Sequence, residues 1–214
     1  MRVSSELKPP DQRSRAQRRA DLGVAANARL TATNAAVLIV LLAAEGATVL
    51  RVRQLISPHV FLGMVLIPPV LLKLGSTGYR FVRYYRGAPA YRRKGPPPLL
   101  LRLLGPVVVI LTVVLLASGV ALLLASPAWS RELLFVHKAS FVLWFFAMTV
   151  HVLGHLPEVA RLAPRDWLRR PRREVPGAST RQWLIAASLV AGALVGLATL
   201  SRIAPWLTST HVGH

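Results

Sequence analysis

The sequence predicts an all-α membrane protein, a polytopic bundle of five transmembrane helices. Hydrophobic residues make up 53% of the 214 positions and the mean hydropathy is +0.47, yet the formal net charge is +19. A soluble domain of this size rarely combines these properties. Here they separate along the chain into apolar blocks and basic connectors, which is typical of a multi-pass membrane protein.

Five apolar blocks are long enough to cross a bilayer as helices, which takes about 20 residues. They are approximately Thr31–Leu50, His59–Tyr79, Leu103–Ala125, Leu133–Leu156 and Trp183–Leu200. Asn34 and Glu45 in the first block are expected to face other helices or the interface, because lipid does not solvate them. Pro68 and Pro69 are expected to bend the second helix and to free a carbonyl that a neighbour must satisfy.

The bundle is expected to occupy residues 27–203. Residues 1–26 are polar and basic and predict a disordered cytoplasmic tail. A signal peptide is disfavoured, because the charged lead is long and no small-residue cleavage site precedes a soluble domain. Residues 204–214 predict a short tail on the outer side.

The distribution of basic residues predicts the orientation. Of the 27 lysines and arginines, 21 lie in the amino-terminal region, the Tyr79–Arg102 loop and the Pro157–Arg181 connector. The opposite side has four, namely Arg51, Arg53, Arg131 and Arg202. The positive-inside rule then places the amino terminus in the cytoplasm and the carboxyl terminus outside, in a bacterial inner membrane. Because topology explains the charge, we expect no nucleic-acid partner.

The composition also limits the chemistry. The chain has no cysteine, which excludes disulfides, iron–sulfur clusters and thiolate metal sites. No nucleophile–base pair or phosphate-binding loop is visible, which argues against hydrolase or kinase activity. A metal or cofactor would need nitrogen, oxygen or thioether ligands.

The fourth block carries three histidines at membrane depth, and ionisable groups there indicate a functional site. His137 and His151 are 14 residues apart, so both leave nearly the same face of a helix, roughly 21 Å apart along its axis. His59, at the start of the second block, is expected on the same outer side as His137. The two imidazoles are therefore candidate axial ligands of one b-type haem iron, although His59 is expected about one turn nearer the surface.

Other residues near this outer pair have two interpretations each. Gly105 and Gly119, again 14 residues apart, either admit a porphyrin or simply allow close helix packing. Lys138, like Arg51 and Arg53, either binds haem propionates or is ordinary interface charge.

A second, inner haem is left open. His151 mirrors His137, but the residue 14 positions after His59 is Lys73. Lys73 is a neutral axial ligand, a partner for a propionate or an anionic quinone, or a lysine that snorkels to the inner interface, and we favour the last. His155, one turn after His151, joins a second site, accepts a proton from a quinol or is an interfacial histidine.

Several motifs resemble the membrane-integral b-type cytochromes that serve bacterial formate dehydrogenases and nickel–iron hydrogenases as electron-transfer subunits. They are His59 opening the second block, Leu103-Leu-Gly-Pro with Ser118-Gly119 in the third, and His137-Lys-Ala-Ser-Phe with His151-Val-Leu-Gly-His155 in the fourth. The resemblance covers about residues 55–157. It implies a helical bundle that passes electrons between quinones and a partner redox protein in a respiratory chain. It supports His59, His137 and His151 as iron ligands, while the missing second histidine departs from the two-haem pattern.

The leading hypothesis is thus a haem b cytochrome, an electron-transfer subunit of an oxidoreductase rather than a self-contained enzyme. A membrane anchor or small transporter-like bundle without cofactor is the alternative, and it should tolerate replacement of His59 or His137. A reductase acting on an outer acceptor such as ferric iron differs only in what takes the electron.

Overall fold

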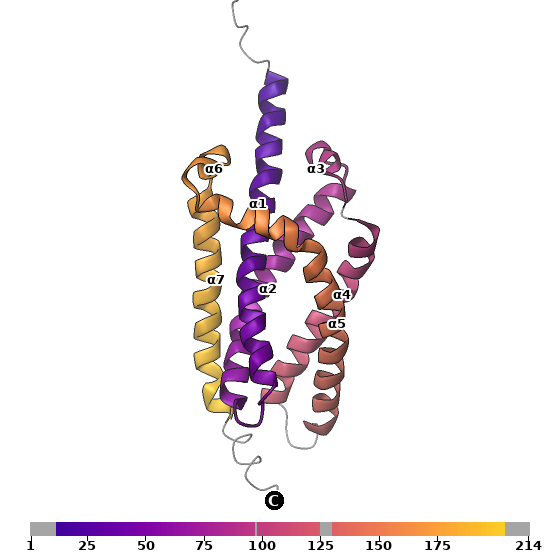
Figure 1. The fold of residues 1–214 in the computed structure, drawn as a ribbon, viewed down its shortest axis with the longest axis vertical. Coiled ribbons are helices and arrows are strands. Elements are labelled where there is room, and N and C mark those ends of the chain that lie inside the picture. Colours follow the sequence, from indigo (N-terminus) through magenta and orange to yellow (C-terminus); the bar gives the residue numbers. More distant parts are fainter. Residues whose placement is uncertain (1–11, 97, 125–129, 204–214) are drawn as a thin grey trace, which may run out of the picture.

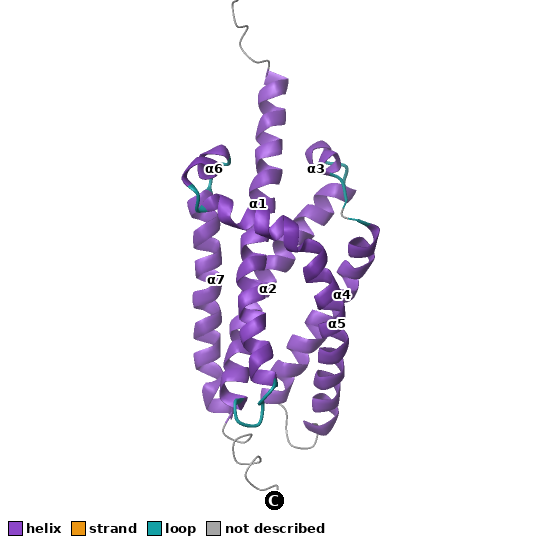
Figure 2. Ribbon diagram, viewed as in Figure 1, coloured by secondary structure: helices purple, strands orange, loops and turns teal. Residues whose placement is uncertain are grey.

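The computed structural model describes residues 12–96, 98–124 and 130–203, and it confirms the all-α fold. Within these residues every regular element is a helix and none is a strand (Figure 2). The elements are α1 (Gln12–Val49), α2 (Ile56–Tyr85), α3 (Pro89–Lys94), α4 (Leu99–Leu124), α5 (Ser130–Leu162), η2 (Ala163–Asp166), α6 (Arg169–Glu174), α7 (Ala178–Thr199) and η3 (Leu200–Ile203).

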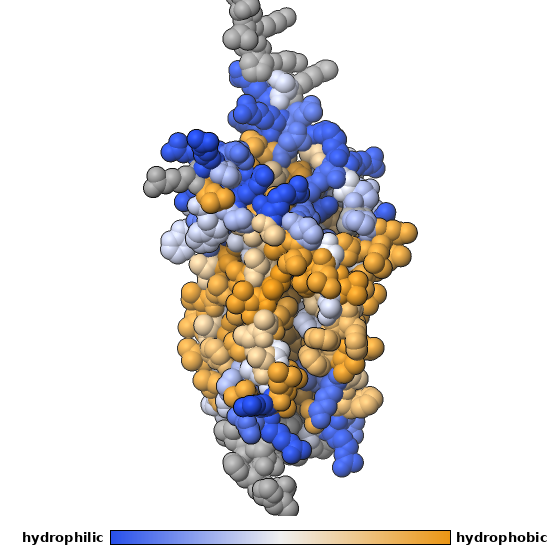
Figure 3. Space-filling model, in the orientation of Figure 1, coloured by the Kyte–Doolittle hydropathy of each residue, from blue (hydrophilic) through white to orange (hydrophobic). Residues whose placement is uncertain are grey.

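The described residues contain five helices, α1, α2, α4, α5 and α7, that are long and apolar enough to cross a membrane. Figure 3 shows a broad hydrophobic band around the middle of the molecule, with hydrophilic residues gathered at both ends. The exposed surface of α5 includes large apolar side chains such as Phe135 and Phe146, which are 73% and 67% exposed. The chain is therefore a multi-pass membrane protein.

The five long helices form two groups. α2 packs against α7 on one side and α1 on the other, whereas α4 packs against α5 (Figure 1). The main link between the groups is the contact of α1 with α5, and α2 touches α4 over a shorter stretch. We call the end that carries α3, η2 and α6 the basic end and the other the far end. That the basic end faces the cytoplasm remains a prediction from its charge.

Helix α1 includes residues 12–26 of the expected disordered tail, and these are helical in the structure. Residues from Gln12 onward are helical and continue into the apolar part of α1, whose first turns project beyond the bundle at the basic end (Figure 1). Residues 1–11 and the expected outer tail, 204–214, lie outside the described residues. Once a span has nucleated a helix, extending it by polar residues adds a hydrogen bond for each residue fixed.

Two glycines of α7 bring that helix against α2. A Cβ atom on Gly192 would overlap the Val65 carbonyl, and one on Gly196 would lie 2.7 Å from the Phe61 ring. Pro69 removes the amide that would otherwise bond the Val65 carbonyl, so this close approach occurs where the α2 backbone is interrupted. Asn34 of α1, fully buried, donates to the Pro69 carbonyl at 2.8 Å. The expected contact of Asn34 with another helix is confirmed.

Helix α5 bends near its end and crosses the bundle. Pro157 lies inside the helix, and the final turns and η2 pass over α1 toward α6 and α7 (Figure 1). Proline interrupts the helical ladder and is the usual cause of such a bend.

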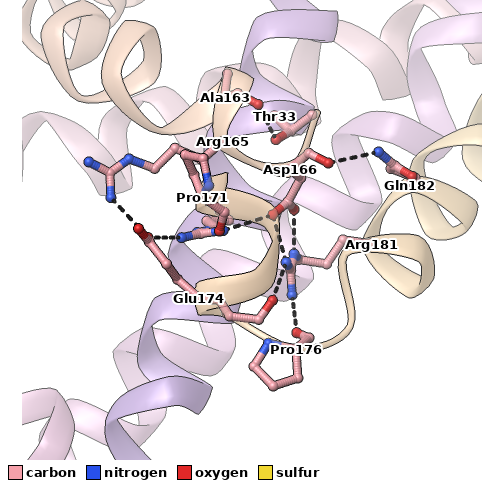
Figure 4. Close-up of polar contacts among 11 residues, drawn as sticks. Thr33, Ala163, Arg165, Asp166, Pro171, Glu174, Pro176, Arg181 and Gln182 are labelled. Atoms are coloured by element: carbon pink, nitrogen blue, oxygen red, sulfur yellow. Dashed lines mark hydrogen bonds and ion pairs between the residues drawn. The ribbon is translucent and has the colours of Figure 1, made fainter. Parts of the chain in front are cut away.

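A buried ionic cluster fixes this crossing segment (Figure 4). Asp166 of η2 is 1% exposed and accepts hydrogen bonds from Arg29 of α1 at 3.3 Å and from Arg181 of α7 at 2.6 Å. Arg29 also donates to Glu174 of α6 at 3.1 Å and to the Pro171 carbonyl at 2.7 Å. Asp166 is therefore the anion that joins α1 and α7 to the crossing segment.

Candidate functional site

The structure brings the two predicted outer histidines together. His59 lies in the first turn of α2 and His137 lies on α5, and their ring centroids are 6.4 Å apart with planes 82° to each other. The expected difference in depth therefore does not keep the two rings apart. The pair lies toward the far end of the bundle.

The Nδ1 atom of His59 is held by helix α1. It lies 2.9 Å from Glu45 Oε1 and 3.0 Å from Thr48 Oγ1. The Thr48 hydroxyl donates its only proton to the Glu45 backbone carbonyl at 2.6 Å, so it can only accept from the ring. Both neighbours of Nδ1 are thus acceptors. The hydrogen-bond network assigns the proton of His59 to Nδ1 and a lone pair to Nε2.

The same assignment follows for His137. Its Nδ1 atom lies 3.1 Å from the Leu115 carbonyl oxygen and 3.1 Å from Ser118 Oγ, both on α4. A carbonyl only accepts, and the Ser118 hydroxyl donates to the Leu115 carbonyl at 3.0 Å. His137 therefore also carries its proton on Nδ1 and a lone pair on Nε2.

Gly119 makes room for the His137 ring. A Cβ atom at this position would lie 3.2 Å from His137 Cε1 and 3.6 Å from Nδ1. The glycine thus accounts for the close approach of the ring to α4. Gly105 differs, since a Cβ there would meet no atom within 4 Å. Lys138 is exposed, and the described residues provide no ion-pair partner for it.

The donor set fits one iron atom between the rings. Within the described chain neither Nε2 atom has a hydrogen-bond partner, so both lone pairs are free. Two imidazoles in line on one metal place their centroids roughly 6 Å apart, because each metal–nitrogen bond is about 2.0 Å and each ring centre lies about 1 Å beyond. The observed 6.4 Å agrees with this separation. Ligating histidines usually bond through their second nitrogen to a carboxylate or carbonyl, as both do here.

The inward face of α5 continues from His137 as the spacing predicted. Ser140 and Trp144 are buried on it, and the Trp144 indole donates to the Thr112 hydroxyl of α4 at 2.9 Å. His151 lies two turns further on and stacks against His155, with ring centroids 4.7 Å apart. The inward face of α5 therefore carries two separate histidine groups: His137, which belongs to the outer pair, and the inner group of His151 and His155.

The inner group is connected to charges at the basic end. His155 Nδ1 lies 3.9 Å from Glu158 Oε2, and Glu158 Oε1 lies 3.5 Å from Lys94 Nζ on α3. Burial lowers the pKa of Lys94 from its ordinary value, and Arg80 adds to this while Glu158 opposes it. His151 Nδ1 is buried and has no hydrogen-bond partner in the described part of the chain.

The inner position differs from the outer one in its residues. Lys73 donates from Nζ to the Thr31 carbonyl of α1 at 3.0 Å, so its amine is bonded to α1. Among the described histidines only His155 contacts His151, and it lies on the same helix. Within the residues that the structure describes, no histidine of another helix opposes His151.

Sequence reasoning did not connect Glu45, Thr48 or Ser118 with the two histidine rings. It expected Glu45, the only acidic residue in its apolar block, to face another helix or the interface, and it named Ser118 only as part of the Ser118-Gly119 motif. Thr48 gave no signal, because hydroxyl groups in membrane helices commonly bond their own backbone. No protein-family model matches the chain, and no match was found among curated proteins or solved structures.

Proposed function

We propose that this protein is a membrane b-type cytochrome that relays electrons through one haem held by His59 and His137. The observation that supports the proposal most strongly is the matched pair of imidazoles, 6.4 Å apart, each with Nδ1 bonded to protein and Nε2 free. When bound, a haem supplies reversible one-electron chemistry. With His59 and His137 both holding the group, no position would be left open for oxygen, which would favour electron transfer over oxygen binding.

The chain's own residues would hold and insulate this site. Glu45 and Thr48 orient His59, while Leu115 and Ser118 orient His137. Gly119 lets the His137 ring lie close to α4. The exposed Lys138 beside His137 is available to a propionate. The inner lysine, Lys73, bonds α1 and takes no part in the outer site.

The electron donor and acceptor follow from the family resemblance described above. On that basis the quinone pool and a partner redox protein are the proposed exchange partners, with the chain acting as an electron-transfer subunit in a bacterial inner membrane. At the basic end of α5, the Glu158 carboxylate and the His155 imidazole lie close together, and we propose that a quinone headgroup binds beside them.

A membrane anchor without cofactor is the alternative. It is favoured by the fact that both Nδ1 atoms already have protein partners and the ring centroids lie 6.4 Å apart, so the histidines also suffice as packing residues between helices. In that case glutamine at position 59 or 137 would be tolerated.

A reduced-minus-oxidised absorption spectrum of the detergent-purified protein tests the proposal, with haem quantified per chain. We expect b-type bands at one haem per chain, absent from His59→Ala and from His137→Ala. His155→Ala is the matched control, since it removes an imidazole from the same face of α5 outside the outer pair. A colourless wild-type protein from haem-replete cells would contradict the cytochrome and leave the anchor.

A further inference from the structure

Glu45 occupies an unusual position for an acidic residue. It lies one turn before the end of α1, its side chain is only 15% exposed, and Gly63 of α2 packs beside it, with a Cβ there 3.7 Å from Oε1. Within the described residues its recorded ion-pair partner is His59 rather than a lysine or arginine. A largely buried carboxylate is costly unless it is bonded. The contact of Glu45 with His59 offsets this cost.

The two candidate ligands consequently have unequal supports. His59 donates to a carboxylate, whereas His137 donates to a backbone carbonyl and a hydroxyl, both neutral. A hydrogen bond to an ionised acceptor is roughly twice as strong as one to a neutral acceptor. It also makes the imidazole more basic and fixes its tautomer and orientation.

We propose that Glu45 is a positioning residue that makes His59 the stronger of the two axial ligands and lowers the reduction potential of the outer site. The inference rests on the proposed function, because it concerns the ligand of the proposed haem. A more basic ligand and a nearby negative charge both stabilise the oxidised, more positive iron. In structural terms, α1 sets the potential of a site whose ligands lie on α2 and α5.

The test measures the midpoint potential and the haem retention of matched variants. Glu45→Gln keeps the volume and a carbonyl acceptor for Nδ1 but removes the charge, so we expect haem at the wild-type level and a higher midpoint potential. Glu45→Ala also removes the acceptor, and we expect haem affinity to fall about 10-fold or more. Glu45→Asp restores a carboxylate and should move the potential back toward the wild type.

Two controls separate this role from simpler effects. Glu132→Gln removes a negative charge from the exposed first turn of α5, and among the described contacts no ion pair joins Glu132 to either ring, so this variant should leave the potential unchanged. Ser118→Ala removes a neutral acceptor from His137 while the Leu115 carbonyl remains, so its shift should be smaller than that of Glu45→Gln.

The outcomes distinguish this inference from the proposed function. A wild-type protein without b-type bands overturns the haem itself, and the role of Glu45 with it. Bands in every variant, with equal potentials for Glu45→Gln and the wild type, overturn only the role of Glu45. Equal shifts in Glu45→Gln and Glu132→Gln would show a general effect of charge and would likewise overturn it. If Glu45→Gln fails to fold, the midpoint potentials of Glu45→Asp, Ser118→Ala and the wild type are compared instead. This comparison then tests the role of Glu45.

Discussion

Trp144 of α5 donates its indole N–H to the Thr112 hydroxyl of α4, and this hydrogen bond separates the outer histidine pair from the inner histidine group. Trp144 is 8% exposed, and the nitrogen–oxygen distance is 2.9 Å. It lies seven residues from His137 and seven from His151, roughly 10 Å along the helix from each. The two groups on one helix face are therefore expected to behave independently.

The first prediction follows from this separation. His151→Ala should leave the haem content at one per chain and leave the b-type bands unchanged, because the residue is distant from His59 and His137 and lacks an opposing ligand. Haem quantification beside the absorption spectrum measures this. Two haems per chain in the wild type, with one lost in His151→Ala, would instead establish an inner site.

The second prediction concerns the ionic cluster. Asp166→Asn leaves the buried guanidinium groups of Arg29 and Arg181 without their shared anion, and breaking such a buried pair costs about 3–5 kcal/mol. We expect a clearly lower thermal unfolding temperature in detergent. Glu174→Gln is the control, because the Glu174 side chain is 58% exposed and exposed pairs contribute about 0–1 kcal/mol. Equal stability of Asp166→Asn and the wild type would contradict the structural role assigned to Asp166.

The third prediction concerns the contact of α7 with α2. Gly192→Ala places a Cβ against the Val65 carbonyl, which is backbone and cannot rotate away, so we expect a loss of about 1–3 kcal/mol. Gly75→Ala is the same substitution in open space on α2 and should be neutral or slightly stabilising. Thermal unfolding of both variants in one detergent provides the comparison. A harmless Gly192→Ala would mean that the two helices lie further apart.

The fourth prediction tests the orientation. Because the chain has no cysteine, single cysteines report accessibility without background. With the basic end in the cytoplasm, a membrane-impermeant maleimide applied to intact cells should label Arg53→Cys and Glu132→Cys at the far end. Arg86→Cys and Arg173→Cys, exposed at the basic end, should react only after the membrane is opened. The reverse pattern would invert the topology.

Much of the fold could be predicted from the sequence because a bilayer restricts the backbone conformations that a chain can adopt within it. Backbone groups in lipid must be bonded within their own segment, so an apolar block of sufficient length becomes a helix. The five blocks and the shared face of His137 and His151 follow from that constraint. Helix ends were less well predicted, since α1 and α2 continue into polar residues that carry no hydropathy signal.

The sequence by itself therefore determined the number of long helices, the chemical limits set by the absence of cysteine, and His59 and His137 as candidate ligands. Only the tertiary structure decided that their rings meet, that Glu45 bonds one and α4 carbonyl and hydroxyl groups bond the other, and that Lys73 turns to α1. The physical reason is that hydropathy and helical periodicity are local properties of one segment. Which polar side chain meets which depends on how separate helices pack, and that packing is fixed by contacts such as Gly192 with Val65 and Asp166 with Arg29 and Arg181.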